Sequence, residues 1–271
     1  MKITVAGGDG RMKTLRTLFA KNGFDCSIEE ARTKAELISE ISVSDAVILP
    51  TPCSKNGFLN APFMKDKTPI GEIFHAGNGK TLFLGGSIGM TGENLIDYSL
   101  CEEYLIKNAV LTAEGAVETA MQETDIALYG SSILVVGFGR IGGYLAKILK
   151  DFGANTVVAA RSEKSRVNAE ISGHKAVSTD GMSDVLPFAD IVFNTVPSVL
   201  FGEKELSCLK RDALLIDLAS LPGGVDTEAA ERLGVNTVHA LGLPGKYSPE
   251  AAGRIIFETV MRIFGERGFS A

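Results

Sequence analysis

The stretch 131–142, Ser-Ser-Ile-Leu-Val-Val-Gly-Phe-Gly-Arg-Ile-Gly, constrains the fold of this chain more than any other feature. The apolar run 133–136 predicts a strand that is buried on both faces of a parallel sheet. Gly137, Gly139 and Gly142 follow with G-x-G-x-x-G spacing, and residues 143–150 have the pattern of a helix. A strand, a glycine turn and a helix in this order are typical of a dinucleotide-binding unit.

Each glycine of such a turn has a physical task. The first permits a tight bend, the second lets a pyrophosphate approach the backbone, and the third lets the helix pack closely on the strand. A chain with 30 glycines also produces this spacing by chance, and a turn without a ligand is the alternative interpretation. The strand before the turn and the helix after it favour a cofactor site, with these expected contacts: Gly137, Phe138, Gly139, Arg140, Ile141 and Gly142.

Composition excludes several other classes of function. The net charge is −6 without a block of like charge, so no nucleic-acid footprint is present. No apolar run approaches the length of a membrane span, and the chain starts directly in a strand pattern. The 4 cysteines are scattered, which indicates reduced thiols in a cytoplasmic protein, and the 3 histidines lack metal-ligand spacing. We therefore expect no metal, no nucleic acid and no membrane among its partners.

Alternating strand and helix patterns predict an α/β protein with two doubly wound parallel-sheet domains. The first domain, 1–111, is expected to be flavodoxin-like, to hold the substrate and to contain a second strand over 25–30 and a loop over 53–69. A helix over 112–128 links it to a Rossmann domain at 129–246. The last segment, 247–271, carries an apolar helical stripe that must be buried, and we expect it to cross back onto the first domain.

The residues after the second strand of the Rossmann domain indicate the type of cofactor. An NAD site usually has an acidic residue about twenty positions beyond the glycines, where it binds the ribose hydroxyls. This chain has Arg161 and Ser162 there, with Arg166 close behind. A guanidinium and a hydroxyl suit a 2′-phosphate, so the sequence predicts NADP rather than NAD. The alternative is a set of surface cations on an ordinary loop.

Further cofactor contacts are expected where other strands of the same domain end. Parallel strands present their carboxyl ends at one edge of the sheet, where ligands bind. The expected contacts at this edge are Asn194, Thr195, Val196, Pro197, Asp217, Leu218, Ala219 and Gly242.

Four residues are candidates for the chemistry. Arg11, behind the turn Gly7-Gly8-Asp9-Gly10, would bind a substrate carboxylate or would be a solvated arginine. Thr112 is expected to be the N-cap of the linking helix, and Glu114 in its first turn is either a proton acceptor or a solvated carboxylate. Lys246 would meet a substrate carboxylate or water. No Ser/His/Asp or Cys/His arrangement is visible in the sequence.

Several motifs together resemble the family of dipicolinate synthase A subunits. Residues 108–115, Asn-Ala-Val-Leu-Thr-Ala-Glu-Gly, are similar to its N-A-x-P-T-A-E-G motif, and 7–11 are similar to its G-G-D-x-R. The glycine turn and the later motifs follow in the same order over essentially the whole chain: Ala159-Ala160-Arg161, Asn194-Thr195-Val196-Pro197, 216–224 and Gly242-Leu243-Pro244-Gly245-Lys246.

The resemblance implies NADP-dependent oxidation of dihydrodipicolinate to dipicolinate in the mother cell of a sporulating bacterium. It also implies a partner, a flavoprotein-like B subunit, together with a dicarboxylate substrate, which asks for cations and N–H donors. Because the oxidation yields an aromatic pyridine, positioning counts for more than a strong general base. The sequence leaves the oligomeric state open, a homo-oligomer included.

Departures from the family pattern keep other functions open. Leu111 stands where the family has proline, Cys101 where it usually has arginine, and 247–249 replace a V-A-P pattern. One alternative is an NADPH-binding, non-catalytic or regulatory subunit whose B partner carries the chemistry. Another is a dehydrogenase of a different small carboxylic acid, such as alanine or a 2-hydroxy acid. The lack of a recognisable catalytic histidine counts against the hydroxy-acid reaction.

Overall fold

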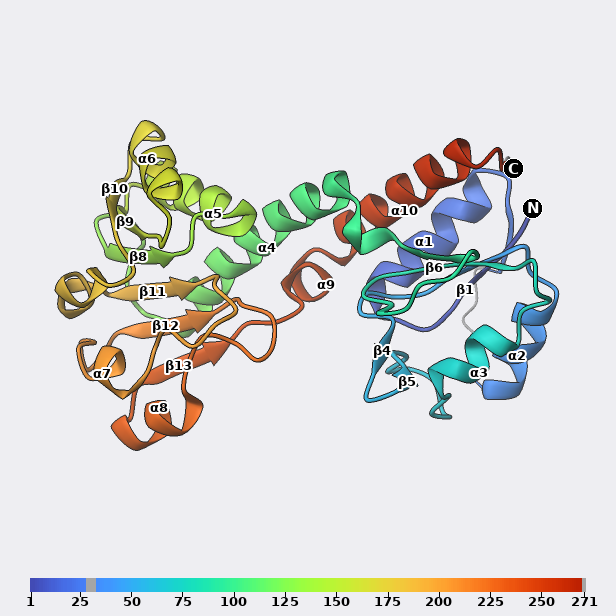
Figure 1. The fold of residues 1–271 in the computed structure, drawn as a ribbon, viewed down its shortest axis with the longest axis horizontal. Coiled ribbons are helices and arrows are strands. Elements are labelled where there is room, and N and C mark those ends of the chain that lie inside the picture. The colour runs from blue at the N-terminus through green and yellow to red at the C-terminus, as the bar shows by residue number, and fades with distance from the viewer. Residues whose placement is uncertain (28–32, 270–271) are drawn as a thin grey trace. The chain divides into compact units, whose positions relative to one another are not determined.

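The computed structural model describes residues 1–27 and 33–269, which divide into two compact units. The first unit comprises 1–108 and 244–271, and the second comprises 109–243 (Figure 1). Both units have a parallel sheet with helices, so the prediction of an α/β fold with two parallel-sheet domains is confirmed. Within the described ranges, none of the helices combines the length and apolarity needed to cross a bilayer.

The sheet of the first unit has the strand order β2-β1-β3-β6-β7. Numbered within this sheet alone, the order is 2-1-3-4-5, as in flavodoxin-like folds. The predicted strand over 25–30 is observed at Asp25–Cys26, and residues 28–32 lie outside the described part of the chain. The elements of this unit in chain order are β1 (Lys2–Val5), α1 (Gly10–Lys21), β2 (Asp25–Cys26), α2 (Lys34–Ser42), β3 (Ala46–Ile48), β4 (Ser54–Lys55), β5 (Phe58–Leu59), α3 (Ile70–His75), β6 (Leu82–Gly85), β7 (Leu95–Asp97), a 3₁₀ turn (Tyr98–Leu100), α9 (Leu243–Tyr247) and α10 (Pro249–Glu266).

Successive residues of each strand face opposite sides of this sheet, and each side has its own core. Ile3 and Ile48 pack with α1 and α10, whereas Val47 and Phe83 pack with α2 and α3. The segment 53–69, expected to be a loop, contains the short antiparallel hairpin β4–β5. Its turn is Asn56-Gly57, and both residues have positive φ, as a two-residue hairpin turn requires.

The last helix, α10, packs along α1 of the first unit (Figure 1). Phe264 is fully buried in this core, and the rings of Phe19 and Phe257 are 5.0 Å apart in an edge-to-face arrangement. Gly253 permits the close approach, because a Cβ there would be 2.6 Å from the carbonyl oxygen of Arg11. The helix therefore belongs structurally to the first unit, although it follows the second in sequence.

The sheet of the second unit has the strand order β10-β9-β8-β11-β12-β13. Numbered within this sheet alone, the order is 3-2-1-4-5-6, that of the Rossmann dinucleotide fold. The strand order reverses between β8 and β11, where such folds bind their ligand. The elements are α4 (Glu102–Glu123), which begins in the first unit, β8 (Ser132–Val136), α5 (Arg140–Asp151), β9 (Asn155–Ala159), α6 (Glu163–Ile171), β10 (Lys175–Val177), 3₁₀ turns (Met182–Asp184 and Leu186–Phe188), β11 (Ile191–Asn194), α7 (Glu203–Leu206), β12 (Leu214–Asp217), α8 (Thr227–Leu233) and β13 (Asn236–His239).

Helix α4 begins ten residues earlier than the sequence pattern suggested. It starts at Glu102 rather than at Thr112, with Glu102 and Glu103 in its first turn. Carboxylates at this end of a helix complement its dipole, and no proline or glycine interrupts residues 102–114. Leu111, in place of the family's proline, keeps its N–H for the helix. The prediction that Thr112 caps a helix and that Glu114 lies in a first turn is therefore wrong.

Candidate active site

The glycine turn of the second unit has the geometry that a pyrophosphate needs. Gly137 adopts φ +97°, and a Cβ there would be 2.2 Å from the hydroxyl of Thr195. A Cβ on Gly142 would be 2.1 Å from the carbonyl oxygen of Gly137, so only glycine lets α5 start this close to β8. A Cβ on Gly139 would have no atom within 4 Å, so the backbone is open to a ligand there.

Helix α5 adds an attraction for negative charge at the same turn. Gly139 is its N-cap and offers no side-chain hydrogen bond to the first turn. That turn holds no acidic residue. The first N–H groups of α5 therefore lie at the positive end of the helix dipole, which favours a phosphate there. The residues of the turn fit a dinucleotide.

A cavity of about 510 Å³ opens beside this turn and collects residues from several strand ends. Its size and its position at the carboxyl ends of the strands suit the adenosine half of a dinucleotide. Sequence reasoning missed Thr179, Ser198 and Leu200, which follow β10 and β11, although the same rule about strand ends applies to them. The cavity is lined by Gly137, Phe138, Gly139, Ala160, Arg161, Ser162, Ser165, Thr179, Thr195, Val196, Pro197, Ser198 and Leu200.

The residues predicted to recognise a 2′-phosphate separate into two groups. Arg161 and Ser162 line the cavity, and Ser162 is the N-cap of α6, where its hydroxyl accepts from the N–H of Ser165 at 3.1 Å. Arg166 instead donates to the carbonyl oxygens of Ala160 at 3.0 Å and Arg161 at 2.7 Å. Among the described residues, the structure records no hydrogen bond or ion pair for the Arg161 side chain. Arg161 is available to a ligand, while Arg166 holds the loop.

Other predicted cofactor contacts form the frame of the site rather than its lining. Asn194 and Asp217 are buried and joined by a hydrogen bond of 2.8 Å between Asn194 Nδ2 and Asp217 Oδ1. Leu218 and Ala219, which follow Asp217 in the chain, are also buried. Gly242 is exposed after β13, with φ +69°.

Arg140 lines a second hollow of about 600 Å³ that shares Phe138 and Gly139 with the cavity of the glycine turn. Ile141 is partly exposed at the start of α5. Both follow the N-cap of α5 directly, so their backbone N–H groups lie at the start of the helix beside the glycine turn.

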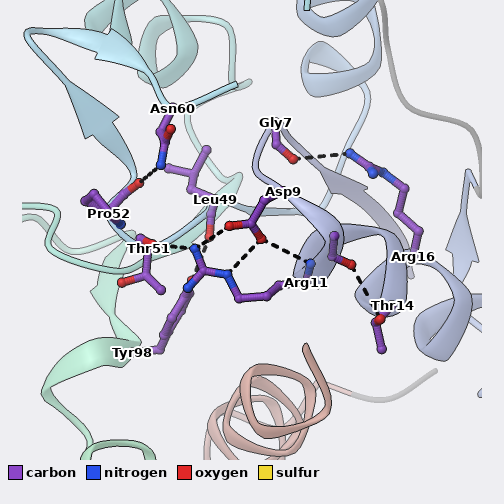
Figure 2. A network of polar contacts seen from close by, with 11 residues as sticks. Gly7, Asp9, Arg11, Thr14, Arg16, Leu49, Thr51, Pro52, Asn60 and Tyr98 are labelled. Carbon is purple, nitrogen blue, oxygen red and sulfur yellow. Dashed lines mark hydrogen bonds and ion pairs between the residues drawn. The ribbon is translucent and has the colours of Figure 1, made fainter. Parts of the chain in front are cut away.

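In the first unit, Arg11 is bound by a carboxylate of the chain itself (Figure 2). Its Nε donates to Oδ1 of Asp9 at 2.8 Å, and its Nη2 donates to Oδ2 of Asp9 at 2.8 Å and to the carbonyl oxygen of Thr51 at 2.9 Å. Burial opposes ionisation of Asp9, but the hydrogen bonds and charge of Arg11 outweigh it, so the pKa of Asp9 is lowered. The same pair raises the pKa of Arg11 despite its burial. The solvated arginine considered from the sequence is not observed.

The turn around Gly245 packs directly against this ion pair. A Cβ on Gly245 would be 2.7 Å from Oδ2 of Asp9 and 3.0 Å from Nε of Arg11. Residues 244–246, expected in the Rossmann domain, therefore belong to the first unit, and Lys246 comes with them. Lys246 is exposed, and its Nζ lies 2.8 Å from the hydroxyl of Tyr247. The fold thus brings Arg11 and the turn of Lys246 together.

The two candidates on α4 lie in the second unit. Thr112 is 8% exposed in the interior of the helix and Glu114 is exposed. Within the described residues, no group of three or more potential metal ligands comes together. The roles of Arg11, Thr112, Glu114 and Lys246 in chemistry remain predictions.

Comparison with known proteins agrees with this geometry. Residues 105–230 match the family model of the D-isomer specific 2-hydroxyacid dehydrogenase NAD binding domain. Over 98% of its length the chain is 30% identical to the A subunit of dipicolinate synthase from Bacillus subtilis, covering 96% of that protein. This chain belongs to the family of dipicolinate synthase A subunits.

Solved structures of this family have the same fold. The A chain of dipicolinate synthase from Bacillus subtilis superposes with a TM-score of 0.83 at 26% identity, covering 98% of this chain and 96% of that one. The corresponding protein from Bacillus halodurans gives a TM-score of 0.82 at 23% identity, with 97% of both chains covered. With the matched dehydrogenase domain, family membership makes this chain an NAD(P)-dependent oxidoreductase.

Proposed function

We propose that this chain oxidises dihydrodipicolinate to dipicolinate with NADP as the electron acceptor. The observation that carries the proposal is the full-length similarity to the dipicolinate synthase A subunit, joined to a glycine turn and cavity that fit a dinucleotide. When bound, the cofactor accepts a hydride from the substrate ring. The protein then has to bind a dicarboxylate, orient its ring and receive one proton.

Carboxylate binding is assigned to Arg11 and Lys246 in this proposal. The support is their proximity within the first unit, where the turn around Gly245 packs on the guanidinium of Arg11. Asp9 fixes that guanidinium by two bonds of 2.8 Å, so its remaining donors have a defined direction. Thr112 and Glu114 are retained as candidates for a hydrogen bond and for proton acceptance, respectively.

We further propose that the cofactor is NADP rather than NAD, because Arg161 lines the cavity without a partner among the described residues. Replacing Arg161 by Asp removes one charge-assisted contact, worth about 1.5–3 kcal/mol, and adds repulsion. The Kd of NADPH should rise by about 10- to 100-fold in a fluorescence titration, while the Kd of NADH changes little. Lys164→Asp, which changes charge equally outside the cavity, is the matched control. Equal losses for both cofactors in the Arg161 variant would refute the assignment.

The reaction is tested by following dipicolinate absorbance with NADP⁺ and freshly formed dihydrodipicolinate. The B-type flavoprotein subunit is the proposed partner, so the assay is run with and without it. We expect stoichiometric dipicolinate and NADPH in at least the complete pair. No dipicolinate from either preparation would refute the proposed reaction.

One observation favours a second function, that of a nucleotide-binding or regulatory subunit. Arg11 already donates three hydrogen bonds within the protein, two to Asp9 and one to Thr51, which leaves fewer of its N–H groups for a substrate. That function predicts NADPH binding without turnover by the reconstituted pair. A dehydrogenase of another small carboxylic acid would instead reduce NADP⁺ with 2-hydroxy acids or alanine in a substrate screen.

A further inference from the structure

A histidine and a buried carboxylate come together in the second unit although they are far apart in the sequence. His239 ends β13 and Asp217 ends β12, and the register of these parallel strands places them opposite each other. Nδ1 of His239 lies 3.6 Å from Oδ2 of Asp217. The Asp217 side chain is 2% exposed, whereas that of His239 is 40% exposed. One partner is thus fixed in the protein and the other is open to solvent or a ligand.

The hydrogen bonds of Asp217 determine what its carboxylate can do. Oδ1 accepts from Asn194 Nδ2 at 2.8 Å and from the N–H of Ala219 at 3.2 Å. Oδ2 accepts from the N–H of Gly224 at 2.9 Å, and its other side faces His239. Three donors hold the carboxylate in place. Because this carboxylate lies 3.6 Å from Nδ1 of His239, Nε2 is the ring nitrogen left for a ligand, and a histidine beside a fixed carboxylate is the arrangement of a positioned general base.

The loop beside Asp217 and His239 is small and uncharged, so it leaves space around the two side chains. A Cβ on Gly223 would be 2.9 Å from Oδ2 of Asp217 and 3.9 Å from Cε1 of His239, so glycine leaves the space between them open. The loop 220–224 contains no charged residue, and Asp217 is the charged side chain that the structure records against His239. Three of the predicted cofactor contacts, Leu218, Ala219 and Gly242, follow the same two strand ends.

We propose that His239 is the catalytic base of this dehydrogenase and that Asp217 is its positioning residue. The assignment rests on the proposed function. In the oxidation, one ring C–H of dihydrodipicolinate gives its hydride to NADP⁺. A second ring hydrogen leaves as a proton to Nε2 of His239, and the electron pair of that bond completes the pyridine ring. Nε2 then passes the proton to solvent through its exposed side.

The test compares His239→Gln with the wild-type chain in the dipicolinate assay, with the B subunit present. Glutamine keeps a polar, exposed side chain but cannot accept a proton. We expect kcat to fall by about 10- to 100-fold, near the lower range for loss of a general base, because aromatisation assists the step. The Kd of NADPH should stay within about twofold, which shows that the cofactor site is intact. His75→Gln, at an exposed histidine of the first unit, is the matched control and should retain wild-type kcat.

A pH profile separates a base from a residue that only supports the fold. Wild-type kcat should fall as the pH is lowered, because a base must be unprotonated to accept a proton, and His239→Gln should lose this dependence. Wild-type kcat and an unchanged profile in His239→Gln would overturn this assignment alone. A wild-type pair that forms no dipicolinate would overturn the proposed function and this assignment with it.

Discussion

Two adjacent glycines at the start of α5 allow a direct test of the cofactor turn. A Cβ on Gly142 would be 2.1 Å from the carbonyl oxygen of Gly137, whereas a Cβ on Gly143 would meet nothing within 4 Å. Backbone atoms on both sides of the first contact must move for alanine to fit, so Gly142→Ala should destabilise the domain by about 1–3 kcal/mol. Gly143→Ala should stabilise it by about 0.4–1 kcal/mol, because alanine lowers the entropy of the unfolded chain.

The assay combines urea unfolding, followed by circular dichroism, with a fluorescence titration of NADPH. Because the turn that holds the pyrophosphate must shift, we expect Gly142→Ala to raise the Kd of NADPH by at least about tenfold. Gly143→Ala should bind with wild-type affinity. If both variants have the same stability and the same Kd, the close packing of α5 on β8 is not what shapes the cofactor site.

Three further predictions concern stability and titration. Phe264→Ala should cost about 3–5 kcal/mol in urea unfolding, because the ring is fully buried between α1 and α10, while Phe188→Ala, at a ring that is 68% exposed, should change stability by less than about 0.5 kcal/mol. The pKa of Asp9 is lowered by its pairing with Arg11, so its stabilisation is present above the ordinary value of 3.8 and is lost as pH falls through the folded value. The Tm difference between wild type and Asp9→Asn should therefore be largest near neutral pH and shrink in acid, and a constant difference would contradict the pairing. Burial and a neighbouring lysine lower the pKa of His174 below 6.5, so its neutral form stabilises the fold above that pH and loses this effect as pH falls through the lower folded value. An NMR titration of its ring protons with a midpoint at or above 6.5 would disagree.

The fold was predictable because its signals are local and repeated. The glycine turn needs only residues 133–142, and strand–helix alternation sets the parallel sheets. The ends of individual helices were harder to predict, because they depend on weak capping preferences of single residues. The start of α4 was misplaced because Thr112 resembles a cap, whereas Glu102 and Glu103 begin an uninterrupted helix ten residues earlier.

The candidate site was less predictable because its contacts join residues that are distant in sequence. Asp217 and His239 are separated by α8 along the chain and meet only through the register of β12 and β13. The contact of Arg11 was not predictable either, although it joins residues that are close in sequence. Its partner Asp9 is two residues away, yet composition cannot show that the guanidinium turns back onto that carboxylate rather than outward. Likewise, the sequence does not distinguish Arg161 from Arg166. In the structure, the Arg166 guanidinium donates hydrogen bonds to backbone carbonyl oxygens of the loop, whereas the structure records none for the Arg161 side chain among the described residues.

We propose that NADP binds at the Gly137–Gly142 turn with its 2′-phosphate at Arg161. A crystal structure of the chain grown with NADP⁺ tests this binding mode. We predict pyrophosphate density over the start of α5 and phosphate density within hydrogen-bond distance of Arg161 and Ser162. Density for the dinucleotide at the Gly7–Gly10 turn, or a ribose that faces away from Arg161, would contradict it.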